Sequence, residues 1–394
     1  MAKIDDSVKK KVPELRFKGF TDEWEERKLS TESTITAGGD IDKSKLKEVG
    51  EYPILANALT NDGIVGYYDS SYRVEAPAVT VTGRGDVGHA KARKVNFTPV
   101  VRLLSVKSKH DVDFLENAIN NHKVLVESTG VPQLTAPQLG NYKIFFPTGE
   151  EQEKIGSFFK QLDDTIALHQ HKLDLLKEQK KGYLQKMFPK NGAKVPELRF
   201  AGFADDWEER KLGEVATLSS SKRIHLSDYV TEGIPFYRGS EISTGGITGN
   251  QELFISQEKF DEIKEKYGVP SEGDILVTAV GTLGNLWKID SRRFYYKDGN
   301  LIQISKMQVN SDYLLTYFTG GIGKKRLLDS AAGSNQKALT MVKMREITVD
   351  FPSEDEQKKI GAFFKSLDDT IALHQRKLDL LKEQKKGFLQ KMFI

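Results

Sequence analysis

The stretch LDDTIALHQHKLDLLKEQKKGYLQKMF, Leu162–Phe188, returns almost unchanged at Leu367–Phe393. The repeat extends upstream, so that Ile155–Phe188 and Ile360–Phe393 align without gaps at an offset of 205 residues. The two copies differ only at Ser157/Ala362, Gln161/Ser366, His171/Arg376 and Tyr183/Phe388. Internal repeats define an architecture before any weaker signal does, so the rest of the chain is interpreted around this pair.

A second repeat precedes each of two longer blocks. VPELRFKGFTDEWEERKL, Val12–Leu29, matches VPELRFAGFADDWEERKL, Val195–Leu212, and we call these segments the leaders. The chain therefore divides into six parts: leader 1–29, block one 30–149, repeated helix 150–190, leader 191–212, block two 213–353 and repeated helix 354–394.

The two blocks differ strongly in sequence but keep a few common marks. Thr82, Gly85 and Gly88 in TGRGDVG match the threonine and glycines of TAVGTLG at 278–284. Each block also ends in a short strand-like run and Phe-Pro, just before its helix. We therefore predict one α/β fold that presents two different surfaces.

The repeated helices carry an apolar seam with a period of 3.5 residues, which is typical of a coiled coil. In the first copy the seam positions are Ile155, Phe159, Leu162, Ile166, His169, Leu173, Leu176, Lys180, Tyr183 and Met187. In the second copy they are Ile360, Phe364, Leu367, Ile371, His374, Leu378, Leu381, Lys385, Phe388 and Met392. The alternative is an amphipathic surface helix without a partner helix.

A helix of about 33 residues is about 50 Å long, and its seam needs a partner of equal length. The other copy is that partner. The predicted fold is α+β: two similar α/β domains separated by two long helices that form an antiparallel intramolecular coiled coil with pseudo-twofold symmetry. The polar seam residues fit control of register. The alternative for His169 and His374, a metal site, lacks further ligands at suitable spacing, and we expect no metal.

Composition places the chain among ordinary soluble proteins of two or three domains. It has 394 residues, 38% of them hydrophobic and 29% charged, with a net charge of +3 and no cysteine. No apolar run is long enough to span a bilayer, and the N-terminus lacks the apolar core of a secretory signal. We therefore expect a cytoplasmic protein without disulfides or thiolate metal sites.

Sequence motifs of common enzymes are absent. GGIGKKR at 320–326 has the wrong spacing for a phosphate loop, and no HExxH, nucleophile elbow or GxGxxG opening a helix occurs. The DPPY or NPPY motif of adenine methyltransferases is also missing, since the chain contains no Pro-Pro. An enzyme with an unrecognised site and a coiled-coil scaffold for other proteins stay open as alternatives.

The chain resembles the specificity subunit of type I restriction–modification systems along essentially its whole length. The most specific parts are the PELRFxGFxxxWEERKL leaders, the repeated helices with FFKxLDDTIALHQxKLDLLK, and GDILVTAVGTLGN in block two. The resemblance implies that the chain is not an enzyme and that each block is a target recognition domain reading one half of a bipartite DNA target. The coil would set the spacer, and two adenine-N6 methyltransferase subunits and the restriction subunits would assemble on it. No cofactor is expected in this chain, whereas S-adenosylmethionine, ATP and Mg belong to the partners.

The charge distribution adds a constraint on DNA binding. Block one contains 13 Lys+Arg and 13 Asp+Glu, and block two contains 17 of each. Neither block is net basic, unlike the usual autonomous DNA-binding domain. We infer that this chain supplies base reading while partner subunits supply much of the phosphate neutralisation.

Base edges are read by polar side chains on loops, and loops rich in such residues are the candidates. In block one these are Asn57, Asn61, Tyr67, Thr82, Arg84, His89, Lys91, Arg93, Ser128, Thr129 and Gln133. Alternatives are a pair between Arg84 and Asp86, turn chemistry at the asparagines, and half-burial of Tyr67. In block two the candidates are Ser220, Lys222, Arg223, Tyr237, Arg238, Ser240, Thr282, Lys297, Asn335, Gln336 and Lys337.

A methyltransferase docking surface is predicted at the leaders and the outer face of the coil. Its candidate residues are Trp24, Trp207, Leu168 and Leu373. For the two tryptophans the alternative is that each anchors its leader on its own block.

Overall fold

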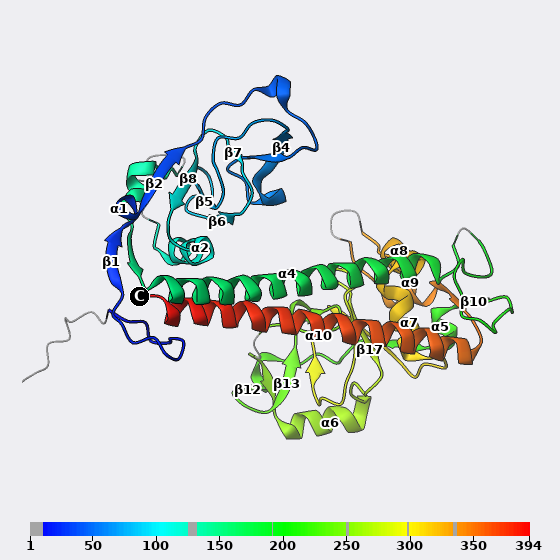
Figure 1. The fold of residues 1–394 in the computed structure, drawn as a ribbon. Helices are drawn as coiled ribbons and strands as arrows, with labels where there is room; N and C mark the ends of the chain where they lie inside the picture. Colours follow the sequence, from blue (N-terminus) through cyan, green and yellow to red (C-terminus); the bar gives the residue numbers. More distant parts are fainter. Residues whose placement is uncertain (1–10, 125–131, 191, 250–251, 298, 334–336) are drawn as a thin grey trace, which may run out of the picture. The chain divides into compact units, whose positions relative to one another are not determined.

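The computed structural model describes residues 11–124, 132–190, 192–249, 252–297, 299–333 and 337–394. The chain forms two compact units, each described by itself. Unit 1 comprises Met1–His171 and Arg376–Ile394, and unit 2 comprises Lys172–Gln375. The long helices drawn in Figure 1 are α4 (Gly149–Lys186) and α10 (Glu354–Met392), and each is divided between the two units. The long helices are thus parts of the two units and not a separate compact body.

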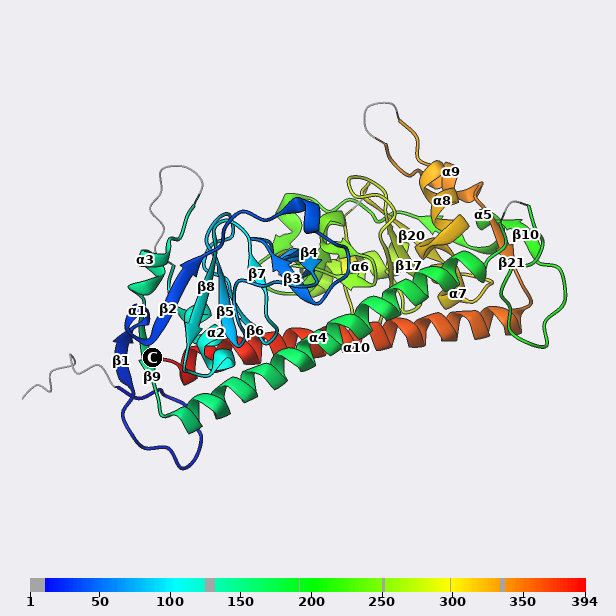
Figure 2. The same cartoon turned by 45° about the horizontal axis from the view of Figure 1, so that its top comes forward.

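Block one is built on a four-stranded antiparallel sheet in the order β2-β8-β5-β6 (Figure 2). These strands are β2 (Ser33–Ala37), β8 (Leu103–Ser108), β5 (Ala78–Thr82) and β6 (Ala90–Arg93). A second sheet has the order β4-β3-β7, with β4 (Ile64–Tyr68), β3 (Tyr52–Leu55) and β7 (Thr98–Pro99). Helix α2 (Val112–Asn121) lies between the first sheet and α4, as Figure 1 shows. The remaining helical segments are α1 (Leu29–Glu32), α3 (Ala136–Gly140), η1 (Lys43–Lys45) and η2 (Thr60–Gly63).

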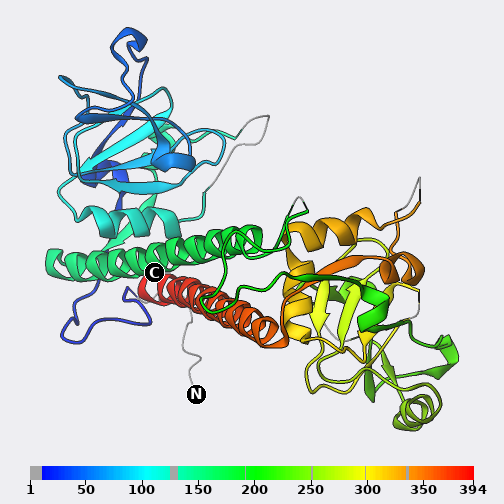
Figure 3. The ribbon, with the colours of Figure 1, turned by 90° about the vertical axis from the view of Figure 1, so that its right-hand side faces the viewer.

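Block two repeats this plan and adds to it. Its main sheet has the equivalent order β11-β20-β17-β18, formed by β11 (Thr217–Ser219), β20 (Leu301–Ser305), β17 (Ile275–Thr278) and β18 (Leu286–Lys288). Figure 3 shows these strands beside α7 (Ser311–Thr319) and α8 (Gly321–Asp329), drawn in yellow to orange. The other elements are α5 (Leu212–Val215), η3 (Leu226–Asp228), β12 (Tyr229–Val230), β13 (Ile234–Tyr237), η4 (Gly239–Glu241), β14 (Ile242–Ser243), β15 (Gly246–Ile247), β16 (Phe254–Ile255), α6 (Gln257–Tyr267), β19 (Tyr295–Tyr296) and α9 (Met341–Arg345). The prediction that both blocks share one fold is confirmed.

Each leader ends in a strand that pairs with the last strand of its block. β1 (Glu25–Lys28) pairs antiparallel with β9 (Lys143–Phe146), and β10 (Glu208–Lys211) pairs with β21 (Thr348–Phe351). The strand pair closes the block just before its long helix begins. The first and the last strand of each block therefore lie side by side at one edge of the block.

The leaders also fasten the two long helices to each other within each unit. In unit 1, Arg16 donates two 2.7 Å hydrogen bonds to Glu151 in the first turn of α4. The adjacent Leu15 N–H donates to the carbonyl of Lys391, near the end of α10, at 2.8 Å. Unit 2 repeats the arrangement with the helices exchanged: Arg199 binds Glu356 of α10, and Leu198 binds the carbonyl of Lys186 of α4. The start of one helix thus lies beside the end of the other, which confirms antiparallel pairing within each unit.

The predicted seam is buried or half-buried at all of its positions. Its outer ends belong to the block cores, since Ile155 and Phe159 pack in the core of unit 1 and Ile360 and Phe364 in that of unit 2. The polar seam residue Lys385 forms 2.6 and 2.8 Å contacts with Asp163 across the helix pair. A partnerless surface helix is therefore excluded, and the lysines in the seam help to set its register.

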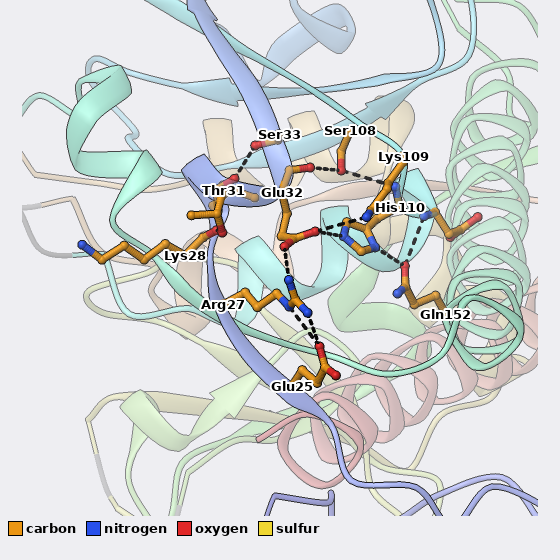
Figure 4. Close-up of polar contacts among 12 residues, drawn as sticks. Glu25, Arg27, Lys28, Thr31, Glu32, Ser33, Ser108, Lys109, His110 and Gln152 are labelled. Atoms are coloured by element: carbon orange, nitrogen blue, oxygen red, sulfur yellow. Dashed lines mark hydrogen bonds and ion pairs between the residues drawn. The ribbon is translucent and has the colours of Figure 1, made fainter.

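A polar network fixes the start of α4 against block one (Figure 4). The Glu32 carboxylate, 6% exposed, lies 3.0 Å from His110 Nε2 and accepts a 3.1 Å hydrogen bond from Arg27. His110 Nδ1 lies 3.1 Å from Oε1 of Gln152 on α4, and its ring stacks on Phe146 with centroids 4.2 Å apart. The network joins the leader strand, the end of β8 and α4 at one point.

Replacing Glu32 by glutamine is expected to lower stability at neutral pH by about 1 kcal/mol, because a charge-assisted hydrogen bond becomes a neutral one. The hydrogen bond to His110 holds the pKa of Glu32 below its usual 4.5. A depressed carboxyl pKa contributes stability that is present above about pH 4.5 and lost as the pH falls through the folded-state value. Urea unfolding at pH 7 and pH 3.5 should show a difference between wild type and variant that shrinks in acid. An equal difference at both values would contradict this assignment.

Candidate nucleic-acid interface

The glycine loop of block one, residues 83–89 between β5 and β6, is organised around a buried threonine. Thr82 is 6% exposed; its hydroxyl donates to the carbonyl of Asp86 and accepts a 3.0 Å hydrogen bond from the N–H of His89. Gly85 and Gly88 adopt φ values of +78° and +87°, which favour glycine. Since its hydroxyl is used inside the loop, the prediction that Thr82 contacts a base is corrected: Thr82 positions the loop.

Block two builds the same loop from different residues. Thr278, 1% exposed, donates to the carbonyl of Thr282 at 2.5 Å and accepts from the N–H of Asn285 at 2.9 Å. Gly281 and Gly284 have φ values of +81° and +74°. The threonine and glycine positions that match in the two sequences therefore also have the same backbone conformation and the same hydrogen bonds.

A second loop lies against the glycine loop in both units. The N–H of Leu134 donates to the carbonyl of Gly83 at 2.9 Å, and in unit 2 Leu339 donates to Ala279 at the same distance. Arg84 also pairs with Gln133 as an isolated β-bridge. Two loops that are 51 residues apart in block one and 60 residues apart in block two thus form one surface in each block.

In block one this surface presents Arg84, His89 and Gln133, all of them exposed. Both Arg84 and Asp86 lie among the described residues, and no ion pair joins them there, although such a pair was the alternative for this arginine. Exposed arginine, histidine and amide groups are the chemistry that reads base edges in the major groove. Arg102 was not among the base-reading candidates; it is exposed and has a φ of +73°, and its carbonyl packs against Gly83.

Several block-one candidates instead hold the framework. Asn57 accepts from the N–H of Gly83 at 2.8 Å and donates to the carbonyl of Val101 at 3.0 Å, so it clamps the glycine loop. Asn61 is a turn residue with φ +48° whose amide donates to Ile64. Asn57 thus holds the glycine loop and Asn61 fits the turn alternative, while adenine reading by either asparagine stays a prediction.

Three further block-one candidates are engaged or covered. Arg93, 13% exposed, donates to Asp62 at 2.6 Å and to Thr80 at 3.0 Å. Lys91 lies 3.7 Å from the same aspartate but stays 56% exposed. Tyr67 is half-buried, as its alternative supposed. Of these three, Lys91 retains a cation that a phosphate can reach.

The block-two candidates divide in the same way. Tyr237 is 7% exposed in an aromatic cluster with Trp287 and Phe294, so the prediction that it reads a base is corrected to a core role. Arg238 is paired with Glu241 and Glu252. Ser220 is half-buried and bonds the carbonyl of Leu301.

The exposed block-two candidates are cations and hydroxyls: Lys222, Arg223, Ser240, Thr282, Lys297 and Lys337. Lys222 also lies over the ring of Tyr267, 4.7 Å from its centroid. Thr282 lies on the glycine loop of block two, and Lys337 lies on the loop that is bonded to it through Leu339. Ser128, Thr129, Asn335 and Gln336 lie outside the described residues.

Both leader tryptophans are anchors. Trp24, 1% exposed, packs edge-on against Phe114 and Phe393, and Trp207, 5% exposed, packs against Phe188 and Tyr313. Because the indoles are buried, the predicted docking surface is corrected to exclude them. Leu168 and Leu373 are 66% and 63% exposed, and they remain its candidates.

Metal sites and membrane-spanning helices were also sought among the described residues. Over these ranges no group of three or more His, Asp or Glu side chains is arranged to hold a metal ion. In the same part of the chain, no helix is both long and apolar enough to cross a membrane.

Comparison with known proteins identifies the relatives of this fold. The profile of the type I restriction modification DNA specificity domain matches twice, over residues 21–178 and 204–383. The type I restriction enzyme MjaVIII specificity subunit of Methanocaldococcus jannaschii is 23% identical over 277 residues, 68% of this chain and 65% of that protein. A putative specificity subunit of Haemophilus influenzae is 30% identical over 167 residues, 41% of each chain. This chain thus spans somewhat less than two thirds of the first relative and less than half of the second.

A solved structure agrees over nearly the full length. The S subunit of a type I restriction–modification system from M. genitalium superposes with a TM-score of 0.69 at 16% identity, covering 97% of this chain and 99% of that one. This likeness confirms the α+β fold with two repeated domains and two long helices. The two relatives are named as specificity subunits, the second as a putative one. With both blocks and both helices matched by one profile, the chain belongs to the type I restriction–modification DNA specificity family.

Proposed function

We propose that this chain gives a type I methyltransferase its DNA sequence specificity, each unit reading one half of a bipartite target. The observation that carries the proposal is the surface that the glycine loop and the loop bonded to it form in each block. Its backbone bonds are the same in both blocks, around Thr82 and Thr278, while its exposed side chains differ. Two domains that recognise different half-sites need the same loop backbone but different polar side chains on it.

The long helices are proposed to set the unread spacer between the half-sites. Helices of 38 and 39 residues are about 57–58 Å long at 1.5 Å per residue, somewhat more than the roughly 50 Å expected from the sequence. This length corresponds to about 1.6–1.7 turns of B-DNA, at about 34–36 Å per turn. Two adenine-N6 methyltransferase subunits, with restriction subunits, would assemble on this chain in the cytoplasm. They would supply S-adenosylmethionine, ATP and Mg.

The docking surface for the methyltransferases is proposed on the helices. Besides Leu168 and Leu373, the equivalent residues Leu175 and Leu380 are 46% and 58% exposed. Each of these leucines has a counterpart 205 residues away, so two copies of one partner would meet the same apolar groups. Exposed leucines that recur in this way mark an interaction surface more than scattered ones do.

A methylation map tests the function. The chain is expressed with its methyltransferase in a methylation-free host, and N6-methyladenine is located by long-read sequencing. We expect one bipartite motif that disappears without this chain. Exchange of residues 30–149 for the first block of another specificity subunit should change one half-site only. Methylation that persists after deletion of the chain would favour the scaffold alternative.

Replacing Arg84 by alanine is expected to weaken binding of the target by about 10- to 100-fold, because a bidentate arginine–guanine contact contributes about 1–3 kcal/mol. Discrimination should relax at one position of the half-site read by block one. The measurement is competition binding of the assembled complex with single-base variants of the target. Lys45→Ala, an exposed cation of the same block, is the control and should leave discrimination intact. Unchanged discrimination in Arg84→Ala would remove Arg84 from the reading surface.

A further inference from the structure

Each unit contains a lysine-lined groove beside the long helices. In unit 2 a groove of about 600 Å³ is lined by Lys177, Lys180, Lys181, Leu184, Gln185, Thr319, Gly320, Gly321, Lys324, Asp368 and Ile371. In unit 1 a groove of about 450 Å³ is lined by Asn121, Asp163, Ile166, Lys382, Lys385, Lys386, Leu389 and Gln390. Seven positions correspond at the offset of 205 residues: Lys177/Lys382, Lys180/Lys385, Lys181/Lys386, Leu184/Leu389, Gln185/Gln390, Asp368/Asp163 and Ile371/Ile166. The same concave site therefore occurs twice.

The central lysine of each groove is a structural residue. Lys180 pairs with Asp368 and Lys385 with Asp163, across the helix pair of the respective unit. The two lysine side chains are only 19% and 25% exposed. Each ion pair neutralises the central lysine of its groove. The net positive charge of the groove therefore comes from the other lysines that line it, which we call the flanking lysines.

The flanking lysines present their charge to solvent. Lys177, Lys181 and Lys324 are exposed in unit 2, and Lys382 and Lys386 in unit 1. Lys181 lies 3.6 Å from Glu178 and keeps 66% exposure, while no ion pair is found for the other four within the described residues. Each groove thus holds cations for an anionic ligand, and the groove of unit 2 has one more, Lys324.

In both units the groove and the glycine loop border the same helix. In unit 2, α8 carries Lys324 in the groove, and its Leu328 lies closest to Gly284 of the glycine loop. The two α8 residues are about 6 Å apart along the helix axis at 1.5 Å per residue. In unit 1, Asn120 of α2 bonds the backbone of Ala90 just after the glycine loop, and the next residue, Asn121, lines the groove.

We propose that both grooves bind phosphate groups of the DNA backbone next to the bases read by each unit, independently of sequence. The inference rests on the proposed function. Its chemical basis is that the blocks have no net positive charge, with 13 cations against 13 anions and 17 against 17. A duplex presents one negative charge per about 1.7 Å of its axis, so a reader without a basic surface needs phosphate contacts elsewhere. Four of the five flanking lysines lie on the repeated helices and the fifth, Lys324, on α8 of block two. Flexible ammonium groups on the repeated helices suit phosphate contacts that do not depend on the target sequence.

The test measures DNA affinity of the complex with its methyltransferase subunits as a function of salt. One variant carries Lys177→Gln, Lys181→Gln and Lys324→Gln, and a second carries Lys382→Gln and Lys386→Gln. Glutamine retains much of the side-chain length and removes the charge, and the Lys180–Asp368 and Lys385–Asp163 pairs stay intact. The matched control is Lys172→Gln with Lys377→Gln, exposed lysines of the same helices that line neither groove. The probes are a duplex with the mapped target and one with that target scrambled.

The slope of log affinity against log salt should become shallower by about 0.9 for each phosphate that the variant no longer neutralises, hence by about 3 in the first variant and about 2 in the second. Affinity for both duplexes should fall by the same factor, which leaves their ratio unchanged. The control should keep the wild-type slope.

An unchanged slope in both groove variants overturns the inference. Loss of subunit assembly with an unchanged slope also overturns it, and assigns the grooves to an acidic surface of a partner protein. A wild-type complex that does not prefer the target duplex would refute the proposed function instead, a result separate from either slope.

Discussion

Replacing Arg16 by methionine is expected to destabilise unit 1 by about 3–5 kcal/mol, the usual effect of removing one member of a buried ion pair. Glu151 is fully buried and receives both of its hydrogen bonds from this guanidinium, at 2.7 Å each. Without the arginine, an uncompensated charge stays in the interior. At about 2–4 °C per kcal/mol for a domain of this size, the melting temperature of unit 1 should fall by about 6–20 °C. Urea unfolding followed by hydrogen exchange of the first turns of α4 measures the effect.

The double variant Arg16→Met with Glu151→Gln separates loss of the pair from exposure of a buried charge. It should recover part of the lost stability, because no unpaired charge remains. Arg199→Met should act in the same way on unit 2, where Glu356 is equally buried. Lys160→Met is the control, since its pair with Asp164 is exposed and should contribute little. A change in Arg16→Met as small as that of the control would show that the leader is not held by this pair.

Replacing Phe159 by alanine is expected to cost unit 1 about 3–5 kcal/mol, the usual range for a fully buried phenylalanine. Its ring is 0% exposed and packs against Phe158 and Phe393, at 5.3 and 5.8 Å between centroids. The truncation removes a contact that joins α4 to the end of α10 and to the core of block one. Hydrogen exchange should show faster opening of unit 1 amides, with Phe364→Ala giving the corresponding result for unit 2.

Leu168→Ala is the matched control on the same helix. Its side chain is 66% exposed, so the truncation should change stability by less than about 0.5 kcal/mol. It should instead weaken assembly with the methyltransferase if the helix face is the docking surface. Comparable destabilisation by Phe159→Ala and Leu168→Ala would contradict the distinction between seam and outer face.

The pattern of the long helices could be predicted because it is local and repeated. A 3.5-residue period specifies which residues face a partner helix, and the second copy of the same period identifies that partner. The seam from Ile155 to Met187 is accordingly buried or half-buried throughout. The matched threonine and glycines of the two loops were predictable for a similar reason, since a positive φ restricts the residue that can occupy the position.

The roles of individual polar residues were less predictable. Asn57 has the right chemistry for adenine, yet its amide clamps Gly83 and Val101. Tyr237 ends a strand beside a promising loop, yet it packs on Trp287. The identity of a residue tells which hydrogen bonds its side chain can form, but not which partners it meets. For Asn57 and Tyr237 these partners lie 26 to 50 residues away in the chain.

The repeat, the seam, the two-block plan and the family resemblance depend on patterns within short windows, so they could be predicted before the fold was known. The folded chain was needed to show that Trp24 is buried, that Arg16 meets Glu151 across 135 residues, and that lysines of the long helices share grooves with residues of the block helices. Burial and pairing are properties of a packed neighbourhood. Such a neighbourhood forms from segments that are distant in the chain, and no local pattern specifies which of them meet.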